Sequence, residues 1–364
     1  MTALSQDVTA SDGPARTSTV VTPRGSFHTP CFMPVGTRGA VRTLTSADLE
    51  TLGVDVMLAN TYHLMLRPGA DVVAELGGLH DFMSWGGHVL TDSGGYQVFS
   101  LDPHVDDDGV EFRSTYDGTK HRLTPERAVE VQEGLGADIQ MVLDVCPAHP
   151  APSEVVRDAV ERTATWARRA RDVHRREGQA LFGIVQGGVD EKLRSESARR
   201  TVEIGFDGYG IGGLSVGESR DEMLPALDAA LAELPADRPR YLMGVGDPVG
   251  IVEAIARGVD MFDCVLPTRL GRHGTILTTA GRLNLRNARY ARDDQPLDPE
   301  GPAVSRRWSR GYLRHLLMVD EPAAARVLTM HNLAWLLALV ERARAAIDEG
   351  NLGGLRAEVA AVWA

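Results

Sequence analysis

Eight short apolar runs, separated by stretches in which apolar residues recur every three or four positions, constrain the fold of this chain most strongly. The runs are rich in Val, Ile, Leu and Met, which is typical of parallel strands buried on both faces. They cover residues 31–36, 56–60, 89–93, 139–144, 181–187, 208–214, 241–245 and 260–265. The periodic stretches predict helices, most clearly at 45–52, 125–135, 153–177, 190–204, 220–234, 248–256 and 332–349.

Strands that alternate with helices in this way predict an α/β chain folded as a (β/α)8 TIM barrel, although an eight-stranded open sheet would give a similar pattern. Two long insertions interrupt the alternation, at 99–124 and from 274 to about 326. We therefore expect a flexible N-terminal tail at 1–20 and a single barrel at 21–364. Within it we expect an inserted small subdomain at about 275–330 and C-terminal helices at 332–364.

Composition disfavours several classes of protein. With 43% hydrophobic and 24% charged residues, the chain is apolar enough to bury a core. No apolar run approaches the roughly 20 residues that span a bilayer, and the N-terminus has neither the basic nor the apolar segment of a secretion signal. We therefore expect a cytoplasmic protein with no membrane partner. A net charge of -12 disfavours nonspecific coating of nucleic acid.

Polar residues stand at the C-terminal ends of four predicted strands, which is where barrels form their active sites. They are Asp92, Asp144, Gln186 and Asp263. A single Asp at such a position is more often a helix cap. Four polar side chains at the C-terminal strand ends of one barrel, however, are expected to lie close together. Glycine-rich segments at 92–97, 186–188, 210–214 and 244–248 leave backbone that a flat ligand can approach closely. The chain lacks the phosphate-binding and dinucleotide-binding glycine motifs, which disfavours those chemistries.

One segment is unusually basic. Residues 264–292 contain no Asp or Glu but hold six arginines, at positions 269, 272, 282, 286, 289 and 292. On its own this pattern fits a solvated surface as well as a contact for RNA phosphates.

Six segments resemble those of tRNA-guanine transglycosylases, the queuine tRNA-ribosyltransferases, and the resemblance runs from about Gly25 to the C-terminus. The segments are TPCFMPVGT at 29–37, NTYHLMLRPG at 60–69, LTDSGGYQVFSL at 90–101, GFDGYGIGGLSVGE at 205–218, YLMGVGDP at 241–248 and RGVDMFDCVLPTRLGRHG at 257–274. The resemblance implies a (β/α)8 barrel enzyme. It implies exchange of guanine at the wobble position of tRNAs with G-U-N anticodons for a 7-deazaguanine such as preQ1 or queuine.

The resemblance also implies catalytic roles. Asp263 matches the nucleophile that attacks C1′ of the ribose and forms a covalent RNA–enzyme intermediate, and Asp92 matches the acid/base residue that deprotonates the incoming base. A carboxylate suits the first role because positive charge develops at the sugar carbon, as in retaining glycosidases. The second role requires a carboxyl group that accepts a proton and later returns it, and therefore a tuned pKa.

The resemblance implies a base pocket in which Asp144 accepts hydrogen bonds from the N1–H and amine of guanine. Gln186 and the Gly213 N–H would contact the carbonyl edge, while Tyr96 and Met243 would sandwich the ring. Such a pocket rejects bases with the opposite pattern of donors and acceptors. Further pocket residues are Ser93, Gly94, Gly95, Leu214 and Cys146, for which a buried apolar thiol is an equal alternative.

Arg269 and Arg272 match family residues that contact the anticodon loop, a single-stranded segment whose base can leave its stack. This match favours RNA contact over a solvated surface for the arginine segment. Further residues expected at this surface are Gly244, Val245, Gly246, Asp247, Pro248 and Thr268.

The zinc site of the family is degenerate here. Family members carry C-x-C-x-x-C and a distant His, whereas residues 296–316 of this chain contain no cysteine. Pro302 and Ser305 stand at two ligand positions, the third is deleted or lies at Glu300, and His331 remains. One imidazole with a serine does not make a structural zinc site, so we expect no metal and no other cofactor. Since this subdomain lies near the family's dimer interface, the resemblance leaves a homodimer as an open alternative.

Two classes of function follow. The first is a base-exchange enzyme whose subdomain is held without zinc. The second is a diverged relative that acts on guanine in DNA, a nucleotide or a natural product, or a non-catalytic RNA-binding subunit. The presence of Asp92, Asp144, Gln186 and Asp263 disfavours the non-catalytic alternative.

Overall fold

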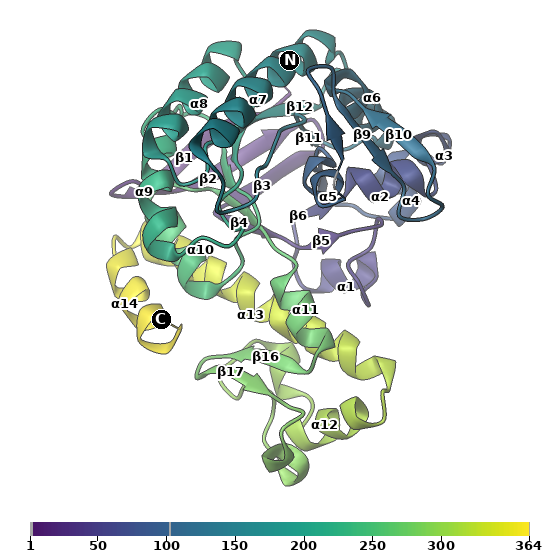
Figure 1. Ribbon diagram of the computed structural model, residues 1–364. Coiled ribbons are helices and arrows are strands. Elements are labelled where there is room, and N and C mark those ends of the chain that lie inside the picture. Colours follow the sequence, from purple (N-terminus) through teal and green to yellow (C-terminus); the bar gives the residue numbers. More distant parts are fainter. Residues whose placement is uncertain (1–2, 102, 364) are drawn as a thin grey trace.

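The computed structural model describes residues 3–101 and 103–363. Its centre is a parallel sheet in the order β4-β15-β14-β13-β12-β11-β7-β6-β5. β4 (Cys31–Met33) and β5 (Val35–Gly36) are two parts of one strand separated by Pro34, and they pair with β15 and β6, respectively. The sheet therefore closes on itself, which confirms the predicted (β/α)8 barrel (Figure 1).

Each of the eight apolar runs contains a barrel strand. The other strands are β6 (Val56–Ala59), β7 (His88–Thr91), β11 (Ile139–Met141), β12 (Ala180–Val185), β13 (Gly208–Ile211), β14 (Arg240–Leu242) and β15 (Met261–Asp263). The predicted helices are also present as α1 (Ser46–Thr51), α6 (Pro125–Leu135), α7 (Ser153–Val173), α8 (Glu191–Ile204), α9 (Arg220–Leu231) and α10 (Pro248–Ile255). Side-chain caps such as Thr124 before α6 and Asp190 before α8 fix where these helices begin.

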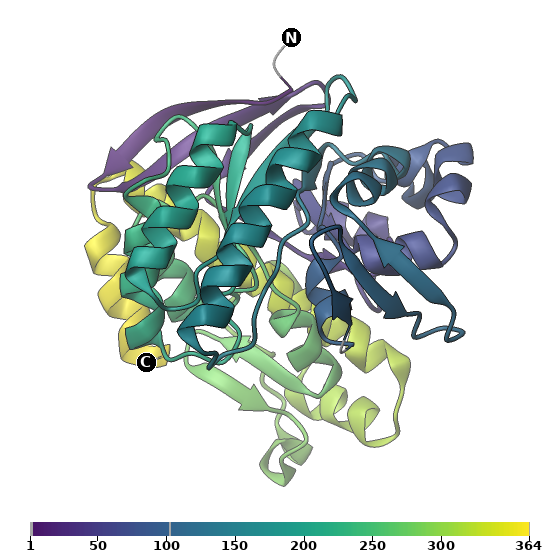
Figure 2. The same cartoon turned by 45° about the horizontal axis from the view of Figure 1, so that its top comes forward.

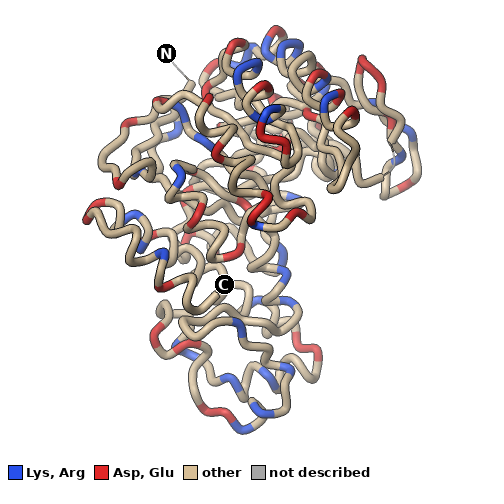
Figure 3. The backbone as a smooth tube through the Cα atoms, turned by 60° about the vertical axis from the view of Figure 1, so that its left-hand side comes forward, with Lys and Arg blue, Asp and Glu red and all other residues tan. Residues whose placement is uncertain are grey.

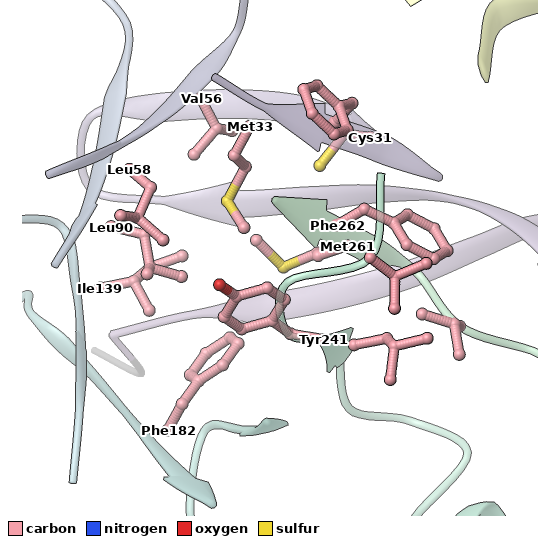
Figure 4. Close-up of a cluster of buried hydrophobic side chains, with 14 of the residues drawn as sticks. Cys31, Met33, Val56, Leu58, Leu90, Ile139, Phe182, Tyr241, Met261 and Phe262 are labelled. Atoms are coloured by element: carbon pink, nitrogen blue, oxygen red, sulfur yellow. The ribbon is translucent and has the colours of Figure 1, made fainter. Parts of the chain in front are cut away.

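The inside of the barrel is packed with side chains. Figure 4 shows them meeting from several strands, and the buried residues there include Met33, Leu90, Phe182, Tyr241 and Met261. Burial of one large apolar side chain contributes about 1.5–3 kcal/mol, so this interior is a major source of stability. Because the centre is filled, no ligand fits inside the barrel, and the mouth at the C-terminal strand ends is where barrels of this kind bind their substrates.

An antiparallel sheet of three strands covers the N-terminal ends of the barrel strands (Figure 2). It comprises β1 (Ser5–Asp12), β2 (Ala15–Thr22) and β3 (Gly25–Thr29). Arg16 pairs with Asp260 at 2.6 Å and Arg24 with Asp138 at 2.8 Å, which ties the sheet to the starts of β15 and β11. The expectation of a flexible tail is therefore wrong for residues 5–20, because β3 supplies a pairing partner; residues 1 and 2 lie outside the described part.

Two regions between barrel strands carry elements that the periodicity did not predict. α2 (Thr61–Leu66), α3 (Ala70–Glu75) and α4 (Gly78–Met83) lie between β6 and β7. After β7 follow α5 (Gly95–Phe99) and a small antiparallel sheet of β8 (His104–Val105), β9 (Val110–Arg113) and β10 (Lys120–Leu123).

The second insertion forms a subdomain with its own apolar cluster, which includes Ile276, Leu285, Leu313 and Leu317. Its elements are β16 (Thr275–Thr278), β17 (Gly281–Asn284), the 3-10 helices η1 (Ala288–Arg292) and η2 (Ala303–Arg306), and α12 (Arg310–Met318). It lies below the barrel in Figure 1. The following helix α13 (Pro322–Asp348) begins at Pro322, earlier than the expected start at 332, and α14 (Leu352–Trp363) ends the described chain.

Among the described helices, α13 alone is long and apolar enough to cross a membrane by length and composition. Leu328, Leu333 and Leu336 on this helix are fully buried, and it contacts β1, β2 and β4. Its apolar side chains are therefore accounted for by packing within the protein.

Candidate active site

The predicted polar residues lie together at the C-terminal mouth of the barrel, opposite the N-terminal sheet. Asp92 follows β7, Asp144 follows β11, Gln186 follows β12, and Asp263 ends β15. Parallel strands bring these ends to one side of the fold. The Gln186 amide donates a hydrogen bond to Oδ2 of Asp144 at 2.6 Å, which shows directly that two of the four side chains meet.

The buried Asp92 carboxylate is held by three donors. They are the Asn60 side-chain amide at 2.6 Å, the Thr61 backbone N–H at 2.7 Å and the Gln97 side-chain amide at 2.9 Å. Burial nevertheless raises the pKa of Asp92 above its usual range, because these hydrogen bonds only partly offset the loss of solvation. A fixed carboxyl group with a raised pKa is suited to accept and return a proton.

Asp263 is fixed through one oxygen only. Oδ1 accepts hydrogen bonds from the Tyr241 hydroxyl at 2.6 Å and from the Gly244 N–H at 2.8 Å, whereas Oδ2 receives none from a described residue. Burial raises the pKa of Asp263, and repulsion from Asp92 raises it further. The two carboxylates are therefore close enough to interact, and Oδ2 of Asp263 accepts no hydrogen bond from a described residue.

Asp144 and Gln186 form a polar wall beside these carboxylates. Ser93 also donates to Asp144, at 3.2 Å. Burial raises the pKa of Asp144 to about 6, opposed by its two hydrogen bonds. Gly213 has φ +67°, and a Cβ there would lie 2.5 Å from Oε1 of Gln186, so this position requires glycine.

The remaining predicted pocket residues surround this wall. Tyr96 is 61% exposed at the start of α5, Met243 is half-buried, and Leu214 is fully buried. Ser93, Gly94 and Gly95 form the turn that leads into α5. Burial raises the pKa of the Cys146 thiol to about 12, which fits a neutral thiol in either of its two interpretations.

A cavity of about 300 Å³ opens beside Gln186 and Gly213. Its other walls come from the segment 147–151 directly after Cys146, from 187–190 and from Val216. The polar wall is therefore continuous with space that a substituent on a bound ring can occupy.

Three arginines gather at α11 (Leu266–Arg272), the helix that follows Asp263 in the chain. Arg269 and Arg272 lie on this helix, which begins three residues after Asp263. Burial lowers the pKa of Arg272, and repulsion from Arg42 and Arg269 lowers it further, which places the three guanidinium groups near one another. Within the described ranges none of them forms an ion pair, so their charges are available to a polyanion.

The other residues expected to contact RNA have visible roles within the protein. Val245, Gly246, Pro248 and Thr268 are buried, and the Thr268 hydroxyl donates to the Val265 carbonyl at 2.9 Å. Asp247 caps α10 through the Gly250 N–H at 2.9 Å and pairs with Arg220 at 2.7 Å, while Gly244 donates to Asp263. Their contact with RNA stays a prediction.

Comparison with known proteins identifies the family. The sequence profile described as Queuine tRNA-ribosyltransferase matches residues 11–364. The chain belongs to the queuine tRNA-ribosyltransferase family. Proteins named queuine tRNA-ribosyltransferase from Halothermothrix orenii, Moorella thermoacetica and Caulobacter vibrioides are 51%, 52% and 52% identical to it. The alignments cover 94%, 94% and 99% of this chain and 93%, 93% and 99% of the relatives. The chain is thus an enzyme of the pentosyl-transferring glycosyltransferases.

Sequence reasoning missed three residues that the structure places at this site, Gln97, Tyr241 and Arg42, and it noted Asn60 only as a polar residue at a strand end. Asn60 lies at a predicted strand end and Gln97 lies within the Asp92 motif, so both carried a positional signal. Tyr241 and Arg42 carried none, since Tyr241 lies inside an apolar run and Arg42 is distant in sequence from Asp263.

The subdomain of this queuine tRNA-ribosyltransferase family member does not fit zinc. His331 is fully buried, and both ring nitrogens are used: Nδ1 lies 2.8 Å from the Ser305 hydroxyl and Nε2 lies 2.7 Å from the Leu277 carbonyl oxygen. Since a carbonyl can only accept, Nε2 carries the proton and Nδ1 accepts from Ser305. No group of three metal-binding side chains occurs in residues 3–101 and 103–363.

Because the ligand set is absent, we expect metal analysis of the purified protein to find less than about 0.1 zinc per chain. Addition of EDTA should leave the melting temperature unchanged, whereas Ser305→Ala should lower the free energy of unfolding by about 1–3 kcal/mol by leaving Nδ1 of His331 without a donor. One tightly bound zinc per chain would contradict this expectation.

Proposed function

We propose that this enzyme replaces guanine at the wobble position of tRNA by a 7-deazaguanine, through a covalent ester between Asp263 and the ribose. The arrangement of Asp263 carries the proposal: one oxygen is anchored by Tyr241 and Gly244 and the other is free, beside a second carboxyl group with a raised pKa. This is the pair of groups that a double-displacement reaction at a sugar carbon requires.

In the first half of the reaction, Oδ2 of Asp263 attacks C1′ as the C1′–N9 bond breaks. The bonding electron pair leaves with guanine, and Asp92 donates the proton that neutralises the departing base. In the second half, Asp92 takes the N9 proton of the incoming base, whose nitrogen attacks C1′ and releases the Asp263 carboxylate. The raised pKa of Asp92 suits both transfers, because the same carboxyl group gives up its proton in the first half and takes one back from the incoming base in the second.

The polar wall supports recognition of a guanine edge. An ionised Asp144 accepts from the N1–H and the 2-amine, whereas the Gly213 N–H and the Gln186 amide donate to the carbonyl oxygen. Guanine and 7-deazaguanines share this edge, so the enzyme can hold both at the same place. The cavity next to Cys146 offers room for a substituent on the incoming base.

Base binding should depend on pH through Asp144. Because the pKa of this carboxyl group is raised to about 6, it is protonated below that pH and then loses its ability to accept two hydrogen bonds. We expect the affinity for guanine, measured by calorimetry, to fall up to about tenfold per pH unit below 6 and to level off above it. Asp144→Asn should bind weakly at every pH; a wild-type affinity that is flat from pH 5 to 7 would refute this role of Asp144.

For the RNA we propose the anticodon loop of tRNA as the partner. Acidic and basic residues are interspersed over most of the backbone (Figure 3), and the net charge of -12 disfavours binding along a whole surface. The unpaired arginines at α11 instead provide a local contact for phosphates.

The double substitution Arg269→Ala with Arg272→Ala should weaken tRNA binding by about 10- to 100-fold and reduce the slope of log Kd against log salt concentration by about 2. Filter binding at several salt concentrations measures both. Arg199→Ala is a matched control, because Arg199 is exposed and paired with Glu233 at 2.7 Å on the outer face. Unaltered tRNA binding by the double variant would show that these arginines form a solvated surface and not a contact for RNA.

Exchange of radiolabelled guanine tests the proposed substrate. We expect incorporation into tRNA with a G-U-N anticodon and none into free nucleotides or duplex DNA. Incorporation only into the latter substrates would show a diverged relative, and binding of tRNA without any incorporation would show a non-catalytic subunit.

We also propose that the enzyme is a homodimer. Tyr312, Met318 and Val319 at α12 are 49%, 52% and 59% exposed, which leaves apolar area on the subdomain for a second copy. Sedimentation at micromolar concentration should give twice the monomer mass, and a monomer under these conditions would refute the proposal.

A further inference from the structure

Arg194 is a fully buried cation in α8 that pairs with no carboxylate of the described residues. Its guanidinium donates four hydrogen bonds, all to backbone carbonyls: Nε to Gly188 at 2.7 Å, Nη1 to Val185 at 3.1 Å and Gly212 at 2.6 Å, and Nη2 to Gly213 at 3.1 Å. Buried charges in proteins are normally paired with an opposite charge, so this arrangement requires an explanation.

Arg16 shows the usual solution in the same molecule. It is also buried, but its guanidinium meets both oxygens of the Asp260 carboxylate, at 2.9 and 2.6 Å. Burial lowers the pKa of Arg194 to about 10, so Arg194 still carries its charge at neutral pH. All of its hydrogen bonds go to carbonyl dipoles, mostly at the ends of β12 and β13, the two strands that lead to Gln186 and Gly213, and the Glu218 carboxylate attracts it without forming an ion pair.

The carbonyls that Arg194 holds determine where two N–H groups point. In a trans peptide the C=O of one residue and the N–H of the next point in opposite directions. The peptides 212–213 and 213–214 are trans. Because the carbonyls of Gly212 and Gly213 both turn toward Arg194, the N–H groups of Gly213 and Leu214 turn away from it. Neither N–H donates to another residue within the described chain, and Gly213 lines the cavity beside Gln186, with Leu214 buried directly behind it.

We propose that Arg194 is a positioning residue for the carbonyl edge of the bound purine. It fixes the two peptides so that the N–H groups of Gly213 and Leu214 form a preset donor pair, and it polarises both peptides through their carbonyls, which strengthens the N–H donors. This inference rests on the proposed function, and it adds a specificity-determining residue to the same site.

The pair of donors also serves the reaction. When the C1′–N9 bond breaks, the electron pair moves onto the purine and is shared with its carbonyl oxygen. Donors that are already oriented stabilise that charge without reorganisation. Loss of Arg194 should therefore weaken binding of purines with a carbonyl and also slow the departure of guanine.

The test compares guanine with two analogues that each change one edge. 6-Thioguanine replaces the carbonyl oxygen by a weakly accepting sulfur, and hypoxanthine lacks the 2-amine that faces Asp144. We expect Arg194→Met to weaken guanine binding by about 30-fold and to bring the ratio of the Kd values for 6-thioguanine and guanine to within about twofold of 1. The ratio for hypoxanthine and guanine should stay at its wild-type value. Arg199→Met, on the same helix, should change neither ratio.

An equal loss of affinity for all three bases, or an unchanged 6-thioguanine ratio, would overturn the proposal, since a structural role alone affects both edges alike.

If Arg194→Met does not fold, Arg194→Lys is tested instead. A lysine keeps the charge but has no planar fork, so the ratio of the Kd values for 6-thioguanine and guanine should fall to a value between that of the wild type and 1. An unchanged ratio in this variant would refute the proposal. Failure of the proposed function is distinct, because the wild type would then neither bind guanine nor exchange it.

Discussion

Asp263→Asn should abolish the covalent RNA adduct and lower the rate of guanine exchange by about 10⁴-fold or more. An amide is too weak a nucleophile to attack C1′, and it cannot balance the positive charge that develops there. The fold should persist, because the amide oxygen of Asn can still accept from Tyr241 and Gly244, the two donors that hold Asp263. The adduct is measured on a denaturing gel after incubation with tRNA.

Two comparisons make this experiment specific. Asp237→Asn changes a carboxylate of similar chemistry that is exposed and distant from the barrel mouth, and should leave exchange unchanged. Tyr241→Phe keeps the nucleophile but removes one of its two donors, and should slow exchange by about 10-fold. An undiminished adduct in Asp263→Asn would show that another residue is the nucleophile.

The second large effect is expected for Asp92→Asn, which should lower exchange by about 10²–10⁴-fold. Asn occupies the same space but cannot take the N9 proton of the incoming base or protonate the departing guanine. Tight binding of tRNA should remain, because the arginines at α11 are untouched. Steady-state exchange and tRNA binding are therefore measured on the same preparation.

Gln97→Ala is the matched comparison for Asp92. Gln97 supplies only one of three hydrogen bonds to the carboxylate, so its loss should reduce exchange by less than about 10-fold and move the acidic limb of the pH profile upward. The sign follows from the charge: removal of a donor destabilises the ionised form, and the pKa of Asp92 rises further. A rate for Asp92→Asn within threefold of the wild type would exclude its role in proton transfer.

Sequence periodicity predicted the alternation of strands and helices, because each buried strand is a short apolar run, but it fitted an open eight-stranded sheet as well, and the family resemblance favoured the barrel. The same pattern predicted that Asp92, Asp144, Gln186 and Asp263 lie together, since the ends of parallel strands are known once the strands are, whereas the catalytic roles proposed for Asp92 and Asp263 came from the resemblance. The N-terminal sheet was missed because its strands are stabilised by pairing with β3 and by ion pairs such as Arg16 with Asp260, which join residues 244 positions apart.

The side chains that hold the site residues in place could not be predicted from the sequence, for a similar reason. Tyr241 is an aromatic residue in an apolar run, and only the barrel geometry brings its hydroxyl to Asp263. Arg194 reads as one of several basic residues on a polar helix, and its burial becomes visible only when α8 packs against β12 and β13. The hydrogen bond from Ser305 to His331 likewise depends on the approach of η2 to α13.

The covalent attachment site provides the most direct measurement. The trapped complex of the wild-type enzyme with tRNA is digested with nuclease and protease, and the modified peptide is sequenced by mass spectrometry. We predict a single ribose-linked peptide modified at Asp263, formed in the wild type and absent in Asp263→Asn. Modification of a different side chain, or rapid exchange of guanine with no linked peptide at all, would contradict the account.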